Sequence, residues 1–268
     1  MTYLYMRKRI AVFFVTGALA ITACSAVAEE TQSGIVDQQA LTILDRAASF
    51  LTKQKQFSAT VDVWQDFVLK NDIKIQFAKT VKLNLRRPDH FRATITTTQP
   101  VRTFFYNGKT LTLVDQSSGF FGTTAAPSTI DKTLTKMEQT YGLTFPLDDL
   151  LMSNPYEGSA EKAQSGQYIG IEMIQGKICH HLAFQHEQLD WQAWVEDGPV
   201  PVLRKLVIIQ KLDQGAPQYM ALFSSWDFTT ELPDYMFNFD ETPGLRRIDI
   251  IESVPEKSAP SSQQKTQG

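Results

Sequence analysis

Apolar residues recur at every second position along two long neighbouring stretches, and this period limits the possible folds of the chain more than any other feature. The first stretch carries the apolar series Val61, Val63, Phe67 and Leu69. After the turn at Lys70-Asn71-Asp72, the second stretch carries Ile73, Ile75, Phe77, Val81, Leu83 and Leu85. A period of two is typical of strands with one buried face, so the pattern predicts a long β-hairpin.

Similar stretches follow along the chain, and turn-forming residues separate them. They span residues 91–97, 101–106, 109–115, 119–123, 168–174, 177–186, 189–195, 202–211 and 218–228. The Asn107-Gly108 pair is the strongest of the turn signals, because both residue types tolerate positive φ. Short connections favour antiparallel pairing of consecutive strands.

Two segments have helical spacing instead. Over residues 38–54 apolar residues recur every three or four positions, which predicts an amphipathic helix with Asp37 as its N-cap. Residues 128–152 show the same spacing. They predict a helix capped by Ser128 or Thr129, followed by a second short helix.

Together these elements predict a mainly β fold of the α+β class, with one antiparallel sheet of about ten or eleven strands. A sheet this wide curls, and the helices are the only other elements with apolar faces to bury. We therefore expect a curved half-barrel whose concave face is covered by the helices.

The first 28 residues have the three parts of an export signal. Basic residues 7–9 precede a short apolar run, and Ala26-Val27-Ala28 is a small-residue cleavage site. Cys24 lies in the sequence Ile21-Thr22-Ala23-Cys24, which fits the pattern before a lipid-modified cysteine in bacterial lipoproteins. Both outcomes stay open: cleavage after Ala28, or acylation of Cys24.

The rest of the chain is long enough for one domain with a full core. We expect an export signal over residues 1–28, a flexible tether over 29–36, a single half-barrel domain over 37–252 and a disordered tail over 253–268. The predicted location is the periplasm of a Gram-negative bacterium. Acylation of Cys24 would associate the domain with a membrane and favour anchoring to the outer membrane.

The net charge argues against nucleic acid as a partner, and the cysteine content argues against disulfide bonds in this fold. Removing the export signal takes away three basic residues and no acidic one, so the formal net charge falls from −3 to −6. Nucleic acid is therefore not an expected partner, because phosphate binding needs a basic surface. Cys179 has no cysteine but Cys24 to pair with, and we interpret it as a small buried hydrophobe.

A metal site is the first chemistry to consider, because Cys179, His180, His181 and His186 lie close together in the sequence. Strand alternation puts His180 and His186 on one face, and Cys179 and His181 on the other. Two ligands on a face are too few for a structural zinc site. We therefore predict neither a metal nor a cofactor here.

A sugar-active hydrolase is the second chemistry to consider. Asp190, Glu196 and Asp197 flank Trp191 and Trp194, and paired carboxylates beside an aromatic platform are typical of glycosidases. Acidic residues at a turn more often bind local backbone groups. The sequence also contains no nucleophile elbow, zinc-protease helix or phosphate-binding loop, so no catalytic residue is predicted.

Apolar side chains are abundant: the sequence has 17 phenylalanine and four tryptophan residues. We expect part of the concave face to line a pocket for an acyl chain, since burial of apolar surface is enough to bind such a chain. The predicted lining residues are Val61, Val63, Phe67, Ile75, Phe77, Leu83, Phe91, Leu134, Met137, Leu150 and Leu151.

Five motifs between residues 37 and 228 carry a family resemblance. They are Arg86-Arg87-Pro88-Asp89, the run from Phe105 to Leu113 around Asn107-Gly108, Tyr141-Gly142 with Pro146-Leu147-Asp148-Asp149-Leu150-Leu151, the run Cys179 to Phe184, and the run Asp190 to Gly198. In these motifs the chain resembles a family of predicted bacterial periplasmic proteins of unknown function. That family is similar to the superfamily of LolA and LolB, the outer-membrane lipoprotein carriers and receptors, and of sigma-regulatory periplasmic sensors. The resemblance implies an unclosed antiparallel half-barrel with helices over its concave side, and it implies no catalysis.

The sequence thus favours a noncatalytic periplasmic or outer-membrane-associated protein that binds a lipid, a lipoprotein acyl chain or another hydrophobic ligand. Two alternatives stay open. One is an envelope interaction or sensor module with a filled core. The other is an envelope hydrolase, which would need Asp190, Glu196 or His181 to converge in one cleft.

Overall fold

The computed structural model describes residues 36–97, 102–143, 145, 147–155 and 163–252. All of these residues belong to one compact unit of the chain. The predicted export signal with Cys24 and the predicted tail lie outside the described residues. Among the residues that are described, no helix is long and apolar enough to cross a membrane.

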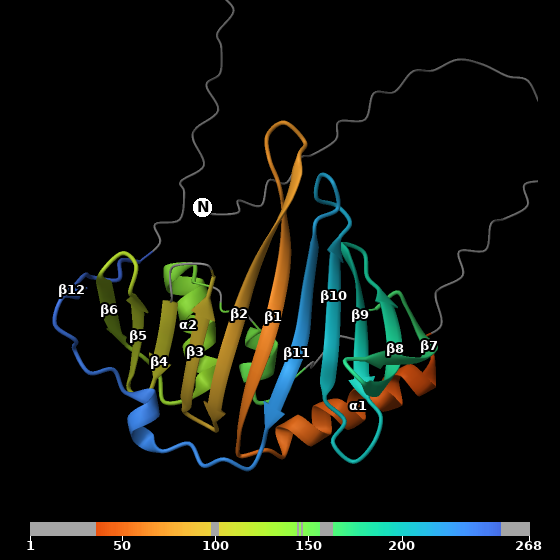
Figure 1. The fold of residues 1–268 in the computed structure, drawn as a ribbon, viewed down its shortest axis with the longest axis horizontal. Helices are drawn as coiled ribbons and strands as arrows, with labels where there is room; N and C mark the ends of the chain where they lie inside the picture. Colours follow the sequence, from red (N-terminus) through yellow and green to blue (C-terminus); the bar gives the residue numbers. More distant parts are fainter. Residues whose placement is uncertain (1–35, 98–101, 144, 146, 156–162, 253–268) are drawn as a thin grey trace, which may run out of the picture. The chain divides into compact units, whose positions relative to one another are not determined.

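One sheet of twelve strands is the largest element of the described chain (Figure 1). Its strands are β1 Gln56–Val68, β2 Lys74–Arg86, β3 His90–Thr96, β4 Arg102–Tyr106, β5 Thr110–Asp115, β6 Phe120–Ala125, β7 Ser165–Ile174, β8 Lys177–Gln185, β9 Leu189–Glu196, β10 Leu203–Gln210, β11 Gln218–Asp227 and β12 Arg246–Arg247. Their spatial order is β12-β6-β5-β4-β3-β2-β1-β11-β10-β9-β8-β7. The predicted mainly β fold with an open antiparallel sheet is confirmed.

The strand count exceeds the prediction because of β12, which has two residues and pairs in parallel with β6. Arg246 N donates to Gly119 O at 2.8 Å, and Ile248 N donates to Phe121 O at 2.8 Å. Two residues are too few to show a period of two, so the sequence gives no signal for this strand.

Three α-helices lie in the described chain: α1 Gln38–Thr52, α2 Ile130–Tyr141 and α3 Asp148–Leu151. The Asp37 carboxylate caps α1 by accepting from Gln39 N at 2.8 Å. Thr129, one of the two predicted caps of α2, accepts from Lys132 N at 3.4 Å. The helix α1 ends at Thr52, two residues earlier than predicted. Gln54 N donates to Leu51 O at 3.1 Å, which closes a tighter final turn.

The helices cover one face of the sheet through two hydrophobic cores. The apolar stripe of α1 packs mainly on β1 and β8–β11, and residues of α2 and α3 pack on β2–β5. Phe57 lies opposite Leu85, and Val61 lies opposite Val81, so both cores occupy the same side of the β1–β2 pair. We call this side the helix-covered face. Each fully buried aliphatic or phenyl side chain contributes about 1.5–3 kcal/mol.

Residues 229–245, which we call the strap, lie against the opposite face of β3–β6. Phe237, at the end of the 3₁₀ helix η1 (Asp234–Phe237), packs against the His90 ring with centroids 5.1 Å apart. Phe239 follows and contacts the rings of Phe105 and Phe121, at 5.8 Å and 5.0 Å between centroids. A hollow of about 210 Å³ lies between the strap and this face.

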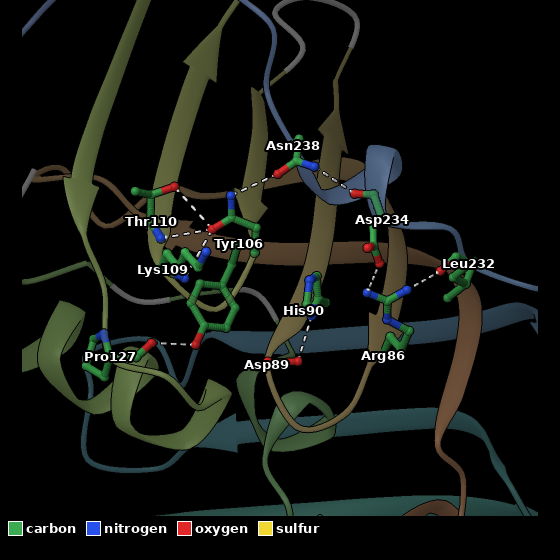
Figure 2. A network of polar contacts seen from close by, with 11 residues as sticks. Arg86, Asp89, His90, Tyr106, Lys109, Thr110, Pro127, Leu232, Asp234 and Asn238 are labelled. Atoms are coloured by element: carbon green, nitrogen blue, oxygen red, sulfur yellow. Dashed lines mark hydrogen bonds and ion pairs between the residues drawn. The ribbon is translucent and has the colours of Figure 1, made fainter.

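Polar contacts also hold the strap (Figure 2). The Arg86 guanidinium donates to Leu232 O at 2.9 Å and pairs with the Asp234 carboxylate. Asn107 Nδ2 donates to Asn238 Oδ1 at 2.9 Å, and Asn238 Nδ2 donates to Asp234 O at 3.1 Å. The strap thus covers part of one side of the sheet, and the helices cover the other side.

Candidate functional site

The β1–β2 hairpin reaches beyond its neighbours in the sheet (Figure 1). Gln65 lies opposite Phe77, and Phe67 lies opposite Ile75. Because side chains alternate along a strand, these residues share a face with Val63, which is fully buried under α1. The helix-covered face therefore continues along the hairpin past its filled core.

The continuation is apolar, and we call its residues the arm strip: Phe67, Leu69, Ile73, Ile75 and Phe77. Exposed fractions are 44% for Leu69, 52% for Ile73 and 58% for Phe77. The rings of Phe67 and Phe77 meet edge to face, with centroids 5.5 Å apart. The Lys74 ammonium donates to Ala216 O at 3.3 Å, which ties the hairpin to the β10–β11 turn.

Three polar side chains interrupt this face where the arm strip meets the core. Gln65 of β1 lies opposite Tyr219 of β11, and its Oε1 accepts from Lys79 Nζ of β2 at 3.5 Å. Burial lowers the pKa of Lys79. Burial also raises the pKa of Tyr219, with a smaller contribution from the charges of Asp148 and Asp149. We call Lys79, Gln65 and Tyr219 the polar trio.

Asp148 and Asp149 begin α3, on the same side of the sheet as Tyr219. Burial, followed by the charge of Asp149, raises the pKa of Asp148 to about 6. Burial raises the pKa of Asp149 as well. Both residues remain accessible to solvent, so water screens much of their effect.

The eleven residues predicted to line a ligand pocket fall into two groups. Phe67, Ile75 and Phe77 belong to the arm strip. The other eight are buried in the two cores: Val61, Val63, Leu83, Phe91, Leu134, Met137, Leu150 and Leu151. That all eleven line a single pocket stays a prediction.

The predicted faces of Cys179, His180 and His181 agree with the structure. His180 shares the face of Leu182 and contacts Tyr168 and Asp197, each at 3.2 Å. His181 lies on the other face. Among the described residues, no group of three or more His, Cys, Asp or Glu side chains could hold a metal ion. Cys179 is fully buried, and burial raises its pKa to about 11, as expected for a buried hydrophobe.

The residues considered for a hydrolase have separate partners. Asp190 pairs with Lys211 at 2.8 Å, and Asp197 contacts His180. Glu196 accepts from Arg204 Nε at 2.6 Å and pairs with Lys177 at 3.2 Å. Trp191 packs in the first core and donates to His186 Nε2 at 2.9 Å.

Sequence reasoning missed the polar trio, although two of its members carry a signal. Lys79 stands between Phe77 and Val81 in the apolar phase of its strand, and Gln65 stands between Val63 and Phe67. A polar residue in the buried phase of a strand marks a group that needs a partner.

An open antiparallel sheet with helices on one face defines a class of proteins of mainly β structure. The chain belongs to the family described as Predicted periplasmic protein (DUF2092), which it matches over residues 40–251. This match confirms the predicted family and the predicted periplasmic location. No functionally curated protein is significantly similar in sequence.

Three solved structures illustrate the remote similarity of the fold. An uncharacterized conserved protein from Thermus thermophilus has 10% identity, with 79% of this chain and 99% of that chain covered and a TM-score of 0.45. The lipoprotein LppX of Mycobacterium tuberculosis has 11% identity, coverage of 74% and 100%, and a TM-score of 0.45. A LolA superfamily protein from Nitrosomonas europaea has 12% identity, coverage of 75% and 97%, and a TM-score of 0.34. Similarity at this level carries no information about a ligand.

Proposed function

We propose that this protein is a noncatalytic periplasmic or outer-membrane-associated protein that binds a hydrophobic ligand, such as a lipid or a lipoprotein acyl chain. The arm strip is the observation that carries the proposal. Its apolar side chains continue a buried face of the sheet, and three of them are at least 44% exposed: Leu69, Ile73 and Phe77.

The physical reason is the cost of leaving such a surface in water. Burial of apolar surface stabilises by about 25 cal/mol per Å², so an acyl chain laid on the arm strip gains free energy without any catalytic group. Single exposed apolar residues are common, but neighbouring ones on one face mark a site of interaction. The arm strip is such a set.

The noncatalytic part of the proposal is supported by the partners of the candidate catalytic residues. Asp190, Glu196 and His181 each contact different side chains. A hydrolase would need at least two of them to share a substrate.

A fluorescent fatty acid titrated into the purified mature protein tests this function. We expect saturable binding, and we expect Phe77→Ser to weaken it about tenfold, since it removes a phenyl ring from the site. Ile178→Ser is the matched control, because Ile178 is a comparably exposed apolar residue on β8, with 52% exposure against 58% for Phe77.

Native mass spectrometry of the same protein gives an independent readout, since a bound lipid adds a defined mass. Absence of both co-purified lipid and fatty-acid binding would contradict the proposed function. Equal losses from Phe77→Ser and Ile178→Ser would contradict its location on the arm strip.

Membrane association through Cys24 belongs to the same proposal. If Cys24 is acylated, the predicted tether would hold the domain near a membrane, and binding would resemble that of a receptor. If cleavage follows Ala28, the domain would diffuse and act as a carrier. The intact mass of the protein from its native host tests this, because acylation adds the mass of the acyl groups.

A second candidate function is an interaction module of the envelope, and the edge strand β7 favours it. Gly166 near its start is bridged to Val36. Further along, Ile171 and Met173 are 62% and 70% exposed. Edge strands with apolar side chains can pair with another strand. Concentration-dependent sedimentation that is abolished by Ile171→Lys, together with no lipid binding, would favour this function.

A further inference from the structure

The polar trio stands between two apolar regions of one face. On one side lie Val63 and Ala221, which are directly opposite each other and fully buried. On the other side begins the arm strip, with Phe67 and Phe77. A polar group at such a boundary is well placed to meet the polar end of a molecule whose apolar part lies on the strip.

The ammonium of Lys79 has no charged partner in the part of the chain that the structure describes. Its hydrogen bond to Gln65 Oε1 is long, at 3.5 Å, and goes to a neutral amide. No described carboxylate lies within ion-pair distance of it. Its lowered pKa agrees with a partly desolvated charge that lacks a counterion.

Tyr219 supplies a second unused group. Its hydroxyl oxygen is buried and has no hydrogen-bond partner among the described residues. A tyrosine hydroxyl keeps its proton at neutral pH, and burial raises the pKa of Tyr219 further, so the hydroxyl is available as a donor. A buried hydroxyl without a partner costs free energy that a ligand oxygen would recover.

We propose that the polar trio binds the carboxylate of a long-chain fatty acid, with Lys79 as the ion-pair partner and Tyr219 as a hydrogen-bond donor, while the acyl chain lies along the arm strip. This inference rests on the proposed function and adds the chemistry of the headgroup to it. From Gln65 to Leu69 the strand extends about 13 Å, which is the length of apolar surface open to the chain.

The charges around the trio favour a carboxylate over a phosphate. One ammonium balances one negative charge, whereas a phosphate monoester carries nearly two at neutral pH. Asp148 and Asp149 lie close enough to Tyr219 to raise its pKa, and they would repel the additional charge. The site therefore fits a single negative charge on an acyl chain.

The test compares palmitic acid with hexadecanol, which has the same chain without the charge. We expect the wild-type protein to bind the acid about tenfold more tightly, as one charge-assisted hydrogen bond requires. Lys79→Met should abolish this preference and keep the affinity for hexadecanol. Tyr219→Phe should reduce the preference in the same direction.

Lys82→Met is the control, because Lys82 is an exposed lysine of the same strand whose side chain points to the opposite face. It should keep the preference for the acid. Equal affinities of the wild-type protein for acid and alcohol, or a preference that survives in Lys79→Met, would overturn the carboxylate site and leave the proposed function intact. Tighter binding of a lysophosphatidic acid than of palmitic acid would also overturn it. If neither the acid nor the alcohol binds, the proposed function fails as well.

Discussion

Glu172 Oε1 lies 2.9 Å from His181 Nδ1, and this contact joins the edge strand β7 to β8. The other carboxylate oxygen accepts from Trp194 Nε1 at 2.9 Å. The imidazole of His181 stacks on the Trp194 indole, with centroids 4.1 Å apart and planes at 14°. These contacts, with the Trp194 hydrogen bond as the largest cause, lower the pKa of Glu172. Its ionised form therefore stabilises the edge of the sheet.

Glu172→Gln should destabilise the protein at neutral pH by at most about 1 kcal/mol, because the carboxylate is solvent-exposed. A carboxyl with a lowered pKa adds stability above its unfolded pKa, and this stability is lost as the pH falls through the folded pKa. The difference between variant and wild type should therefore shrink at acid pH. Thermal unfolding across this range tests the prediction, and a difference independent of pH would contradict it.

Asp148→Asn should stabilise the protein at neutral pH, whereas Glu172→Gln should destabilise it. The pKa of Asp148 is raised to about 6, so its folded state binds a proton more tightly than its unfolded state. Stability from this group is present at low pH and falls as the pH rises from about 4 to about 6. The variant should be as stable as the wild type near pH ~4 and more stable than the wild type above pH ~6. The difference should be less than about 1 kcal/mol, because water screens the group. Denaturant unfolding at both pH values measures the difference, and a less stable variant at neutral pH would contradict the prediction.

Phe91 and Phe77 should respond differently to truncation, because one is fully buried and the other is 58% exposed. Phe91→Ala leaves a cavity in the core between β2–β5 and the helices α2 and α3. It should lower the free energy of unfolding by about 3–5 kcal/mol. Phe77→Ala should change the free energy of unfolding by less than about 1 kcal/mol. Urea unfolding of both variants tests this, and similar costs would mean that the arm strip is part of the core.

Two substitutions at Asn107 should distinguish its role in the turn from its contact with the strap. Its Oδ1 accepts from Thr110 N at 2.9 Å within the turn, and its Nδ2 donates to Asn238 of the strap. Asn107→Asp keeps the acceptor and loses the donor, so it should expose the strap to limited proteolysis with little loss of stability. Asn107→Ala loses both and should cost about 1–3 kcal/mol more. Equal protection of the strap in wild type and Asn107→Asp would contradict this role.

The strands and helices follow from the sequence because each has a period that repeats within the element, as in Ile73, Ile75 and Phe77. The strap does not follow from the sequence in this way, since Phe237 and Phe239 make isolated contacts from an irregular segment. The polar trio depends on the pairing of β1 with β11, which brings Gln65 beside Tyr219 from far along the chain. Alternation places a residue on a face, but it does not tell which distant strand lies next to it.

Photo-crosslinking with a fatty acid that carries a diazirine in its acyl chain tests most directly where a ligand binds. The wild-type protein should be labelled on peptides of the hairpin that contain Phe67 or Phe77, and an excess of palmitic acid should suppress the labelling. Labelling confined to the exposed edge around Ile171 and Ile178, or labelling that palmitic acid does not suppress, would contradict binding on the arm strip.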